Sequence, residues 1–137
     1  WMAPGRKRSA KREEDSEGYG HLESVNYFPY SEKARHEVQE KLNIPDSALI
    51  KRYIGFFIGD RRIRYKKEIK SRKMKVVSSI KEMPRKQVIT INQEFYNDLG
   101  ELCAAGFIAQ VFVNLDSRKM IMPLEDFMQT LRGYFQD

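Results

Sequence analysis

Cysteine is nearly absent from this chain. Only Cys103 occurs among the 137 residues, which excludes an internal disulfide and leaves a cysteine zinc pair without its second ligand. The sequence also lacks an apolar run of about 18 residues, as a membrane-spanning helix would need. Its first twenty residues lack the apolar centre of a secretory signal peptide. We therefore expect a protein of a reducing compartment that has no membrane partner.

Recognisable catalytic motifs are missing as well. The sequence contains no glycine-rich dinucleotide- or phosphate-binding loop and no His-Glu-x-x-His zinc motif. The two histidines, His21 and His36, stand near the N-terminus, and Cys103 lies among apolar residues without a basic neighbour. From these absences we predict a non-enzymatic protein with no cofactor, no metal and no catalytic residue.

Positive charge is concentrated in one part of the chain. Residues 51–86 hold fourteen basic and three acidic side chains, a net charge of +11, whereas the whole chain carries +6. Such a block attracts a polyanion, most often a nucleic acid. An acidic protein, an anionic membrane surface and a merely solvated protein surface are the alternatives.

A chain of this length accommodates one domain with a tail. Residues 1–20 show no hydrophobic period, so we expect a disordered tail with basic and acidic clusters. Its basic residues are typical of a nuclear-import signal and predict a nuclear protein: Arg6, Lys7, Arg8, Lys11 and Arg12. Residues 21–137 are predicted to form one domain, made of an N-terminal helix and connector (21–46), a basic sheet with a helix (47–106) and a hairpin with a C-terminal helix (107–137).

The predicted fold class is α+β. Gly59-Asp60 separates two β-prone runs, 53–58 and 61–66, in a pattern typical of a two-residue hairpin. Strands over 73–80 and 87–91 complete an antiparallel four-stranded meander. Apolar residues at helical spacing predict helices over about 32–42, 93–105 and 124–135, and a second hairpin is expected over 108–122.

Pairing across Gly59-Asp60 sorts the side chains of the first hairpin onto two faces. The core face collects Ile54, Phe56, Ile58, Ile63 and Tyr65. The other face, extended by strand 73–80, forms a predicted nucleic-acid-binding site: Tyr53, Phe57, Arg62, Arg64, Lys66, Lys73 and Lys75. Aromatic rings among cations favour single-stranded DNA or RNA, which exposes both base faces and phosphates. Alternatively, the rings only pack beneath the arginine stems.

The run Arg85-Lys86-Gln87-Val88-Ile89-Thr90-Ile91-Asn92-Gln93-Glu94-Phe95-Tyr96-Asn97-Asp98-Leu99 follows three basic strands. It resembles the last strand and the helix start of PUR-repeat and positive-cofactor type single-strand-binding domains, and the likeness covers residues 50–106. The resemblance implies a ββββα unit that binds single-stranded DNA or RNA on its curved sheet and dimerises. It places most of the predicted site residues at ligand positions, although the segment after residue 106 has two strands where a second repeat would have four.

Together these observations predict a nuclear, non-enzymatic protein that binds single-stranded DNA or RNA. A homodimer or a protein partner is expected to use helix 93–105 or 124–135. The alternative function is an interaction adaptor or assembly subunit of a nuclear or viral complex, which docks through Tyr27, Phe28 and Tyr30. A small nuclease that depends on Asp60 is a third possibility.

Overall fold

The computed structural model describes residues 1–2, 10–13, 27–68 and 73–136. Its elements along the chain are β1 (Ala10–Glu13), α1 (Tyr27–Lys41), α2 (Asp46–Ile50), β2 (Ile54–Tyr65), β3 (Lys73–Ser79), β4 (Ile89–Tyr96), β5 (Leu102–Asn114), β6 (Met120–Ile121) and α3 (Glu125–Phe135). The predicted α+β class is therefore correct, whereas the predicted order of elements is not.

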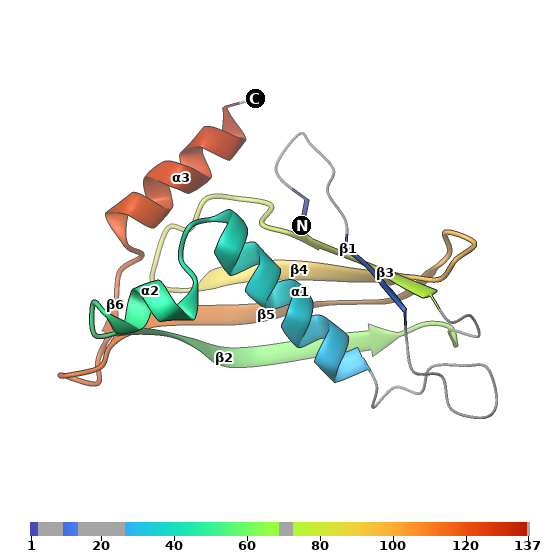
Figure 1. The fold of residues 1–137 in the computed structure, drawn as a ribbon, viewed down its shortest axis with the longest axis horizontal. Coiled ribbons are helices and arrows are strands. Elements are labelled where there is room, and N and C mark those ends of the chain that lie inside the picture. The colour runs from blue at the N-terminus through green and yellow to red at the C-terminus, as the bar shows by residue number, and fades with distance from the viewer. Residues whose placement is uncertain (3–9, 14–26, 69–72, 137) are drawn as a thin grey trace.

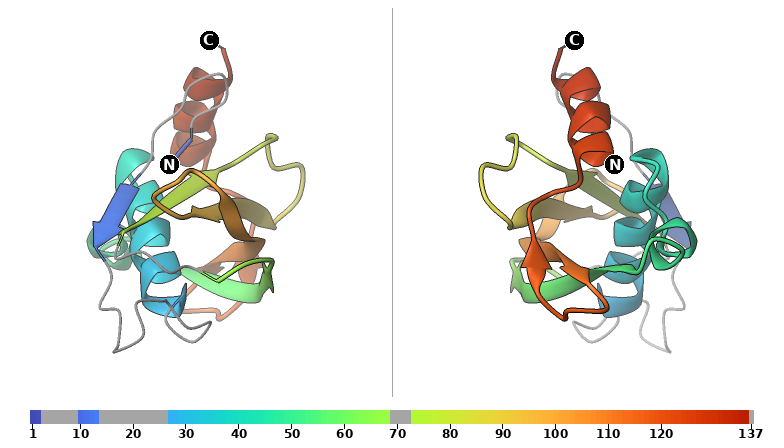
Figure 2. Two further views of the ribbon diagram at one scale, coloured as in Figure 1. Left: turned by 90° about the vertical axis from the view of Figure 1, so that its right-hand side faces the viewer. Right: turned by 90° about the vertical axis from the view of Figure 1, so that its left-hand side faces the viewer.

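The strands form one antiparallel sheet in the order β1-β3-β4-β5-β2, with β6 paired to β5. The long helix α1 lies across this sheet (Figure 1). The two end-on views of Figure 2 show α1 on one side of the sheet, while the other side carries no helix among the described residues. We call that second side the helix-free face. The strand β2 occupies one end of the sheet order and is an edge strand.

The predicted hairpin at Gly59-Asp60 is wrong, because residues 54–65 form one continuous strand. This strand pairs along its whole length with β5, which offers thirteen residues of backbone hydrogen-bonding groups. Gly59 marks a β-bulge, since the register shifts between Ile58 and Asp60. The extra residue keeps Ile63 on the same side of the sheet as Phe56, so the predicted sorting of side chains onto two faces still holds.

The predicted helix over 93–105 is also wrong. Burial in β4 alternates, with Ile89, Ile91 and Phe95 inside, which is the period of a strand. The chain then turns at Asn97, whose side-chain oxygen accepts hydrogen bonds from the backbone N–H groups of Leu99 and Glu101. Leu99, which completed the helical pattern, is 78% exposed.

Helix α1 begins at Tyr27, five residues before the predicted start. Pro29 is compatible with this because the first turn of a helix needs no backbone N–H from it. Ala34, Val38 and Gln39 are all buried, so α1 packs closely on the sheet.

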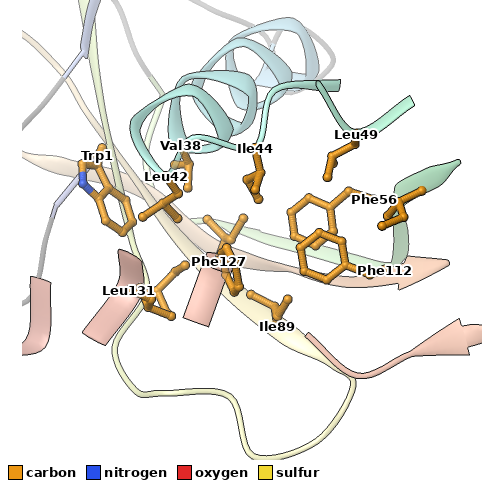
Figure 3. Packing of buried hydrophobic residues seen from close by; sticks show 13 residues of the cluster. Trp1, Val38, Leu42, Ile44, Leu49, Phe56, Ile89, Phe112, Phe127 and Leu131 are labelled. Atoms are coloured by element: carbon orange, nitrogen blue, oxygen red, sulfur yellow. The ribbon is translucent and has the colours of Figure 1, made fainter. Parts of the chain in front are cut away.

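The main core lies between the sheet, the C-terminal half of α1, and helices α2 and α3 (Figure 3). Phe56 and Phe112 stack with ring centroids 4.4 Å apart, and Phe127 of α3 meets Phe112 edge-on at 5.4 Å. Leu131 is fully buried beside them. The apolar stripe of α3 therefore packs into the core of its own chain, with Phe127 and Leu131 fully buried.

A second cluster lies beneath the N-terminal half of α1 and contains Tyr27, Met74 and Phe95. Between the two clusters, a buried polar link joins α1 to the sheet. Ser31 donates a hydrogen bond to Gln93 Oε1 (2.5 Å), and Gln93 Nε2 donates to the Ser31 carbonyl oxygen at 3.0 Å. Gln93 Nε2 also lies 3.4 Å from the Ser78 hydroxyl. All three residues are almost fully buried, so these bonds fix where the helix sits.

Of the predicted N-terminal tail, the structure describes residues 1–2 and 10–13. Residues 10–13 form β1, which pairs antiparallel with β3. The remaining residues of the predicted tail lie outside the described ranges. No helix in the described ranges has the length and apolar character required to cross a membrane.

Candidate functional site

A group of charged side chains connects α1 to the edge strand β2. Glu32 of α1 pairs with Arg35 one turn later, with 2.7 Å between Oε2 and the guanidinium, and with Arg61 of β2. Partial burial raises the pKa of Glu32, but hydrogen bonds from Arg35 and Arg61 outweigh it and hold that pKa below its ordinary value. Glu32 is therefore an ionised link between the two elements.

A second polar group continues this network toward α2. Gln39, only 1% exposed, accepts a hydrogen bond from Arg35 and donates to Asp46 Oδ1 at 2.9 Å. Asp46 Oδ2 lies 3.8 Å from His36 Nδ1. His36 Nε2 lies 3.3 Å from the Arg35 guanidinium and 3.7 Å from Glu32 Oε2. One oxygen of Asp46 is thus held by Gln39 and the other faces a histidine.

Asp46 stands on the wall of a groove of about 430 Å³ between the helices and β2, which we call the α2–β2 groove. The groove is lined by Arg35, Asp46, Ile50, Ile54, Gly55, Phe56, Phe57, Ile58 and Leu115. Ile50, Phe57 and Ile58 keep much of their surface exposed, at 60%, 47% and 38%. The groove therefore combines an apolar lining with one positioned carboxylate.

In the described part of the chain, no group of three or more His, Cys, Asp or Glu side chains is arranged so that it could hold a metal ion. Cys103 is fully buried, and this burial raises the pKa of its thiol. A thiol in this state is not a nucleophile.

The structure divides the predicted nucleic-acid-binding residues into separate groups. Phe57, Arg62 and Arg64 share the helix-free face of β2, whereas Lys73 and Lys75 belong to β3. Two strands lie between β2 and β3 in the sheet order, so three strand spacings, about 14 Å, separate them. Tyr53 and Lys66 flank β2 at its opposite ends, and Tyr53 has a positive φ of 56°.

The other predicted residues are also dispersed. Tyr27, proposed for docking, is 2% exposed, and the Phe28 ring lies 4.6 Å beneath the Arg61 guanidinium. Asp60 forms an ion pair with Arg62 at 3.2 Å. Of the nuclear-import candidates, Lys11 and Arg12 belong to β1, and Arg6, Lys7 and Arg8 lie outside the described residues. Nuclear import stays a prediction.

The sequence analysis did not predict the polar side chains that join α1 to α2 and β2. We call this set the α1–α2 polar group: Glu32, Arg35, His36, Gln39, Asp46 and Arg61. The spacing of Glu32, Arg35 and His36 at i, i+3 and i+4 would have placed them on one helix face. However, no local sequence pattern indicated that Asp46 lies beside His36. Nor did one indicate that Arg61 contacts Glu32, which precedes it by 29 residues.

Solved structures of thioesterases share this fold. A Staphylococcus aureus protein solved in complex with CoA superposes with a TM-score of 0.84 at 11% identity, over 99% of this chain and 87% of that one. A DHNA-CoA thioesterase from Staphylococcus aureus gives 0.78 at 22% identity, over 93% and 89%. A 1,4-dihydroxy-2-naphthoyl-CoA thioesterase from Synechocystis gives 0.76 at 13%, over 96% of both chains. The shared arrangement, a long helix against a curved antiparallel sheet, is the hotdog fold.

No curated protein matches the sequence significantly. A family model for the thioesterase-like superfamily, however, matches residues 13–131. This match contradicts the predicted nucleic-acid-binding function with its single-stranded DNA or RNA partners, the resemblance to PUR-repeat and positive-cofactor domains, and the prediction of a non-enzymatic protein. The chain belongs to the thioesterase-like superfamily.

Proposed function

We propose that the protein hydrolyses acyl thioesters of coenzyme A. The observation that carries this proposal is the family match over residues 13–131. Three CoA thioesterases of the same fold, two acting on 1,4-dihydroxy-2-naphthoyl-CoA (DHNA-CoA) and one on gentisyl-CoA, support the class of substrate. The α2–β2 groove supplies a place for the acyl group.

The groove suits an acyl chain or ring because its lining is mostly apolar. Its volume of about 430 Å³ falls within the range of about 300–1,000 Å³ that is usual for small-molecule sites. Ile50, Phe57 and Ile58 present apolar surface to the ligand. Burying that surface against an acyl group gives roughly 25 cal/mol per Å².

The polar end of the groove supplies a base for hydrolysis. Asp46 Oδ2 accepts a proton from a water molecule as the water oxygen bonds to the thioester carbonyl carbon, and His36 lies beside that carboxylate. The tetrahedral intermediate then breaks its C–S bond, and the thiolate takes up the proton. An acid and a free thiol result. A thiolate leaves readily because the pKa of an alkyl thiol such as cysteine is about 8.5. Gln39 is a positioning residue that holds Asp46 Oδ1.

Release of free thiol from a panel of acyl-CoA thioesters, followed with a thiol-reactive dye, tests the proposal. We expect turnover by the wild-type protein and a loss of about 10²- to 10⁴-fold in kcat for Asp46→Asn, the usual contribution of a general base. Glu40→Gln is the matched control, since Glu40 is an exposed carboxylate on α1 without a partner in the described residues.

Two results would contradict parts of this proposal. No hydrolysis of any CoA thioester would remove the function. Hydrolysis that survives Asp46→Asn and His36→Gln would remove the assigned base, and carboxylates such as Asp15 and Glu17, which precede α1 in the sequence, would then be substituted in turn.

A further inference from the structure

The connection between β3 and β4 forms a second hollow of about 540 Å³, which we call the basic cleft. It is lined by Lys81, Glu82, Met83, Pro84, Arg85, Lys86, Val88, Thr90 and Asn92. Three of these side chains are cationic and only Glu82 is acidic. Neither the α1–α2 polar group nor the α2–β2 groove includes any of them.

The cations of the basic cleft have no carboxylate partner among the described residues. Lys81, Arg85 and Lys86 are exposed and form no ion pair with any described residue. By contrast, Arg61 pairs with Glu32 and Arg132 pairs with Glu125. Three cations without a carboxylate partner can neutralise a bound anion without first breaking an internal ion pair.

The rest of the cleft offers a mixed surface for a larger ligand. Thr90 and Asn92 alternate with the buried Ile89 and Ile91, so they present a hydroxyl and an amide on the helix-free face. Val88, 49% exposed, and Pro84 add apolar surface. Met83 packs against the main core and anchors the loop that carries the cations.

We propose that the basic cleft binds the phosphorylated adenine nucleotide end of a coenzyme A thioester. The inference rests on the proposed function, because that substrate has an uncharged acyl end and a highly anionic nucleotide end. The two hollows differ in the same way: the α2–β2 groove is apolar with its charges paired, and the cleft is cationic with its charges free. Cations suit the phosphates, the hydroxyl and amide suit the ribose, and the apolar wall suits the adenine ring.

The two hollows lie within reach of one extended ligand. Thr90 of β4 pairs with Ala109 of β5, which pairs with Asp60 of β2. Two strand spacings, about 10 Å, therefore separate the cleft strand from the groove strand. Gly55 and Phe57 of the groove face the same side of the sheet as Thr90. Arg35 and Asp46 reach the groove from the helix side, so the ligand would pass around the edge strand β2. The pantetheine arm of coenzyme A would cross the small Ala109.

The test compares the triple variant Lys81→Gln/Arg85→Gln/Lys86→Gln with a control that removes the same number and kind of charges elsewhere, Lys33→Gln/Lys41→Gln/Arg118→Gln. We expect the KM for acyl-CoA to rise about tenfold or more in the triple variant, with kcat little changed, which corresponds to the loss of one or more charge-assisted hydrogen bonds. Hydrolysis of the same acyl group on N-acetylcysteamine, which lacks the nucleotide, should be unaffected. The control should match the wild type throughout.

Calorimetric titration with CoA and with dephospho-CoA gives a readout independent of catalysis. The Kd for CoA should rise in the triple variant, and Arg85→Gln alone should give a smaller rise with less risk to folding. If wild-type protein binds CoA in this way but hydrolyses no thioester, the proposed function fails and the cleft assignment stands. Normal hydrolysis with KM and Kd unchanged in the triple variant would overturn the cleft alone. A KM effect confined to thioesters of an acidic carrier protein would overturn it too, in favour of a protein ligand.

Discussion

Replacing Glu32 with Gln tests whether the link between α1 and β2 stabilises the protein. The substitution keeps the size of the side chain and an oxygen acceptor but removes its charge. Arg35 and Arg61, whose side chains are only 10% and 15% exposed, would then face each other without a counter-charge. Both arginines are too buried for water to replace the carboxylate fully.

The expected loss in the free energy of unfolding is about 2 kcal/mol. Hydrogen bonds to charged groups contribute about 1.5–3 kcal/mol, exposed ion pairs contribute about 0–1, and breaking a buried pair costs about 3–5. Glu32, at 23% exposure, lies between the last two cases. Urea unfolding followed by circular dichroism at pH 7 measures the difference, and Glu40→Gln, on the exposed side of α1, should change stability by less than about 0.5 kcal/mol.

The same variant makes a prediction about pH. Because the pKa of Glu32 is lower in the folded protein than in the unfolded chain, its contribution is fully present above the unfolded pKa. The contribution is lost as the pH falls through the folded pKa. The stability gap between wild type and Glu32→Gln should therefore be constant near neutral pH and close in acid. A gap below about 0.5 kcal/mol at pH 7, or one that persists in strong acid, would refute the reasoning.

Two backbone predictions concern β2 and β5. A Cβ added to Gly106 would overlap the Arg62 carbonyl group, with its carbon 2.8 Å away, so Gly106→Ala should cost about 1–3 kcal/mol or more and lower the melting temperature; an unchanged melting temperature would contradict this. Deleting Gly59 removes the bulged residue, so the side chains on either side of it stay on their present faces of the sheet. Deleting Arg62 instead moves the side chains that follow it to the opposite faces. Thermal melts should show the first deletion folded and the second unfolded.

The local chemistry of the sequence was enough to predict the α+β class, the two faces of β2 and the C-terminal helix, but not the extent of β2, β4 and β5 or their pairing. Phe56 and Ile63 lie on the same side of the sheet both in a hairpin with a two-residue turn and in a continuous strand with a bulge. The alternation of side chains therefore could not distinguish the hairpin from the continuous strand. The choice of β5 as the partner of β2 depends on contacts between residues 39 to 60 positions apart in the chain. Likewise, Phe95 and Leu102 fit a helical spacing, and only the turn at Asn97 resolves it into two strands.

The candidate site was less predictable than the fold. Its groove is assembled from residues as distant in the chain as Arg35 and Leu115. The excess of positive charge over residues 51–86 was interpreted as a nucleic-acid site, which the family match contradicts. Several of these cations neutralise carboxylates of the same chain. Arg52 pairs with Asp126, and Lys67 pairs with Glu101. Net charge alone does not distinguish such internally paired cations from free ones.

The hydrogen bonds among Ser31, Gln93 and Ser78 have a consequence for selectivity. Apolar contacts alone would tolerate a helix that slides or rolls on its sheet, because they have little directional preference. Hydrogen bonds are directional, so these bonds hold α1 in one position on the sheet. The neighbouring groove therefore has one defined width. Under the proposed function, disrupting these hydrogen bonds would weaken the selectivity for acyl-chain length while leaving the reacting groups in place.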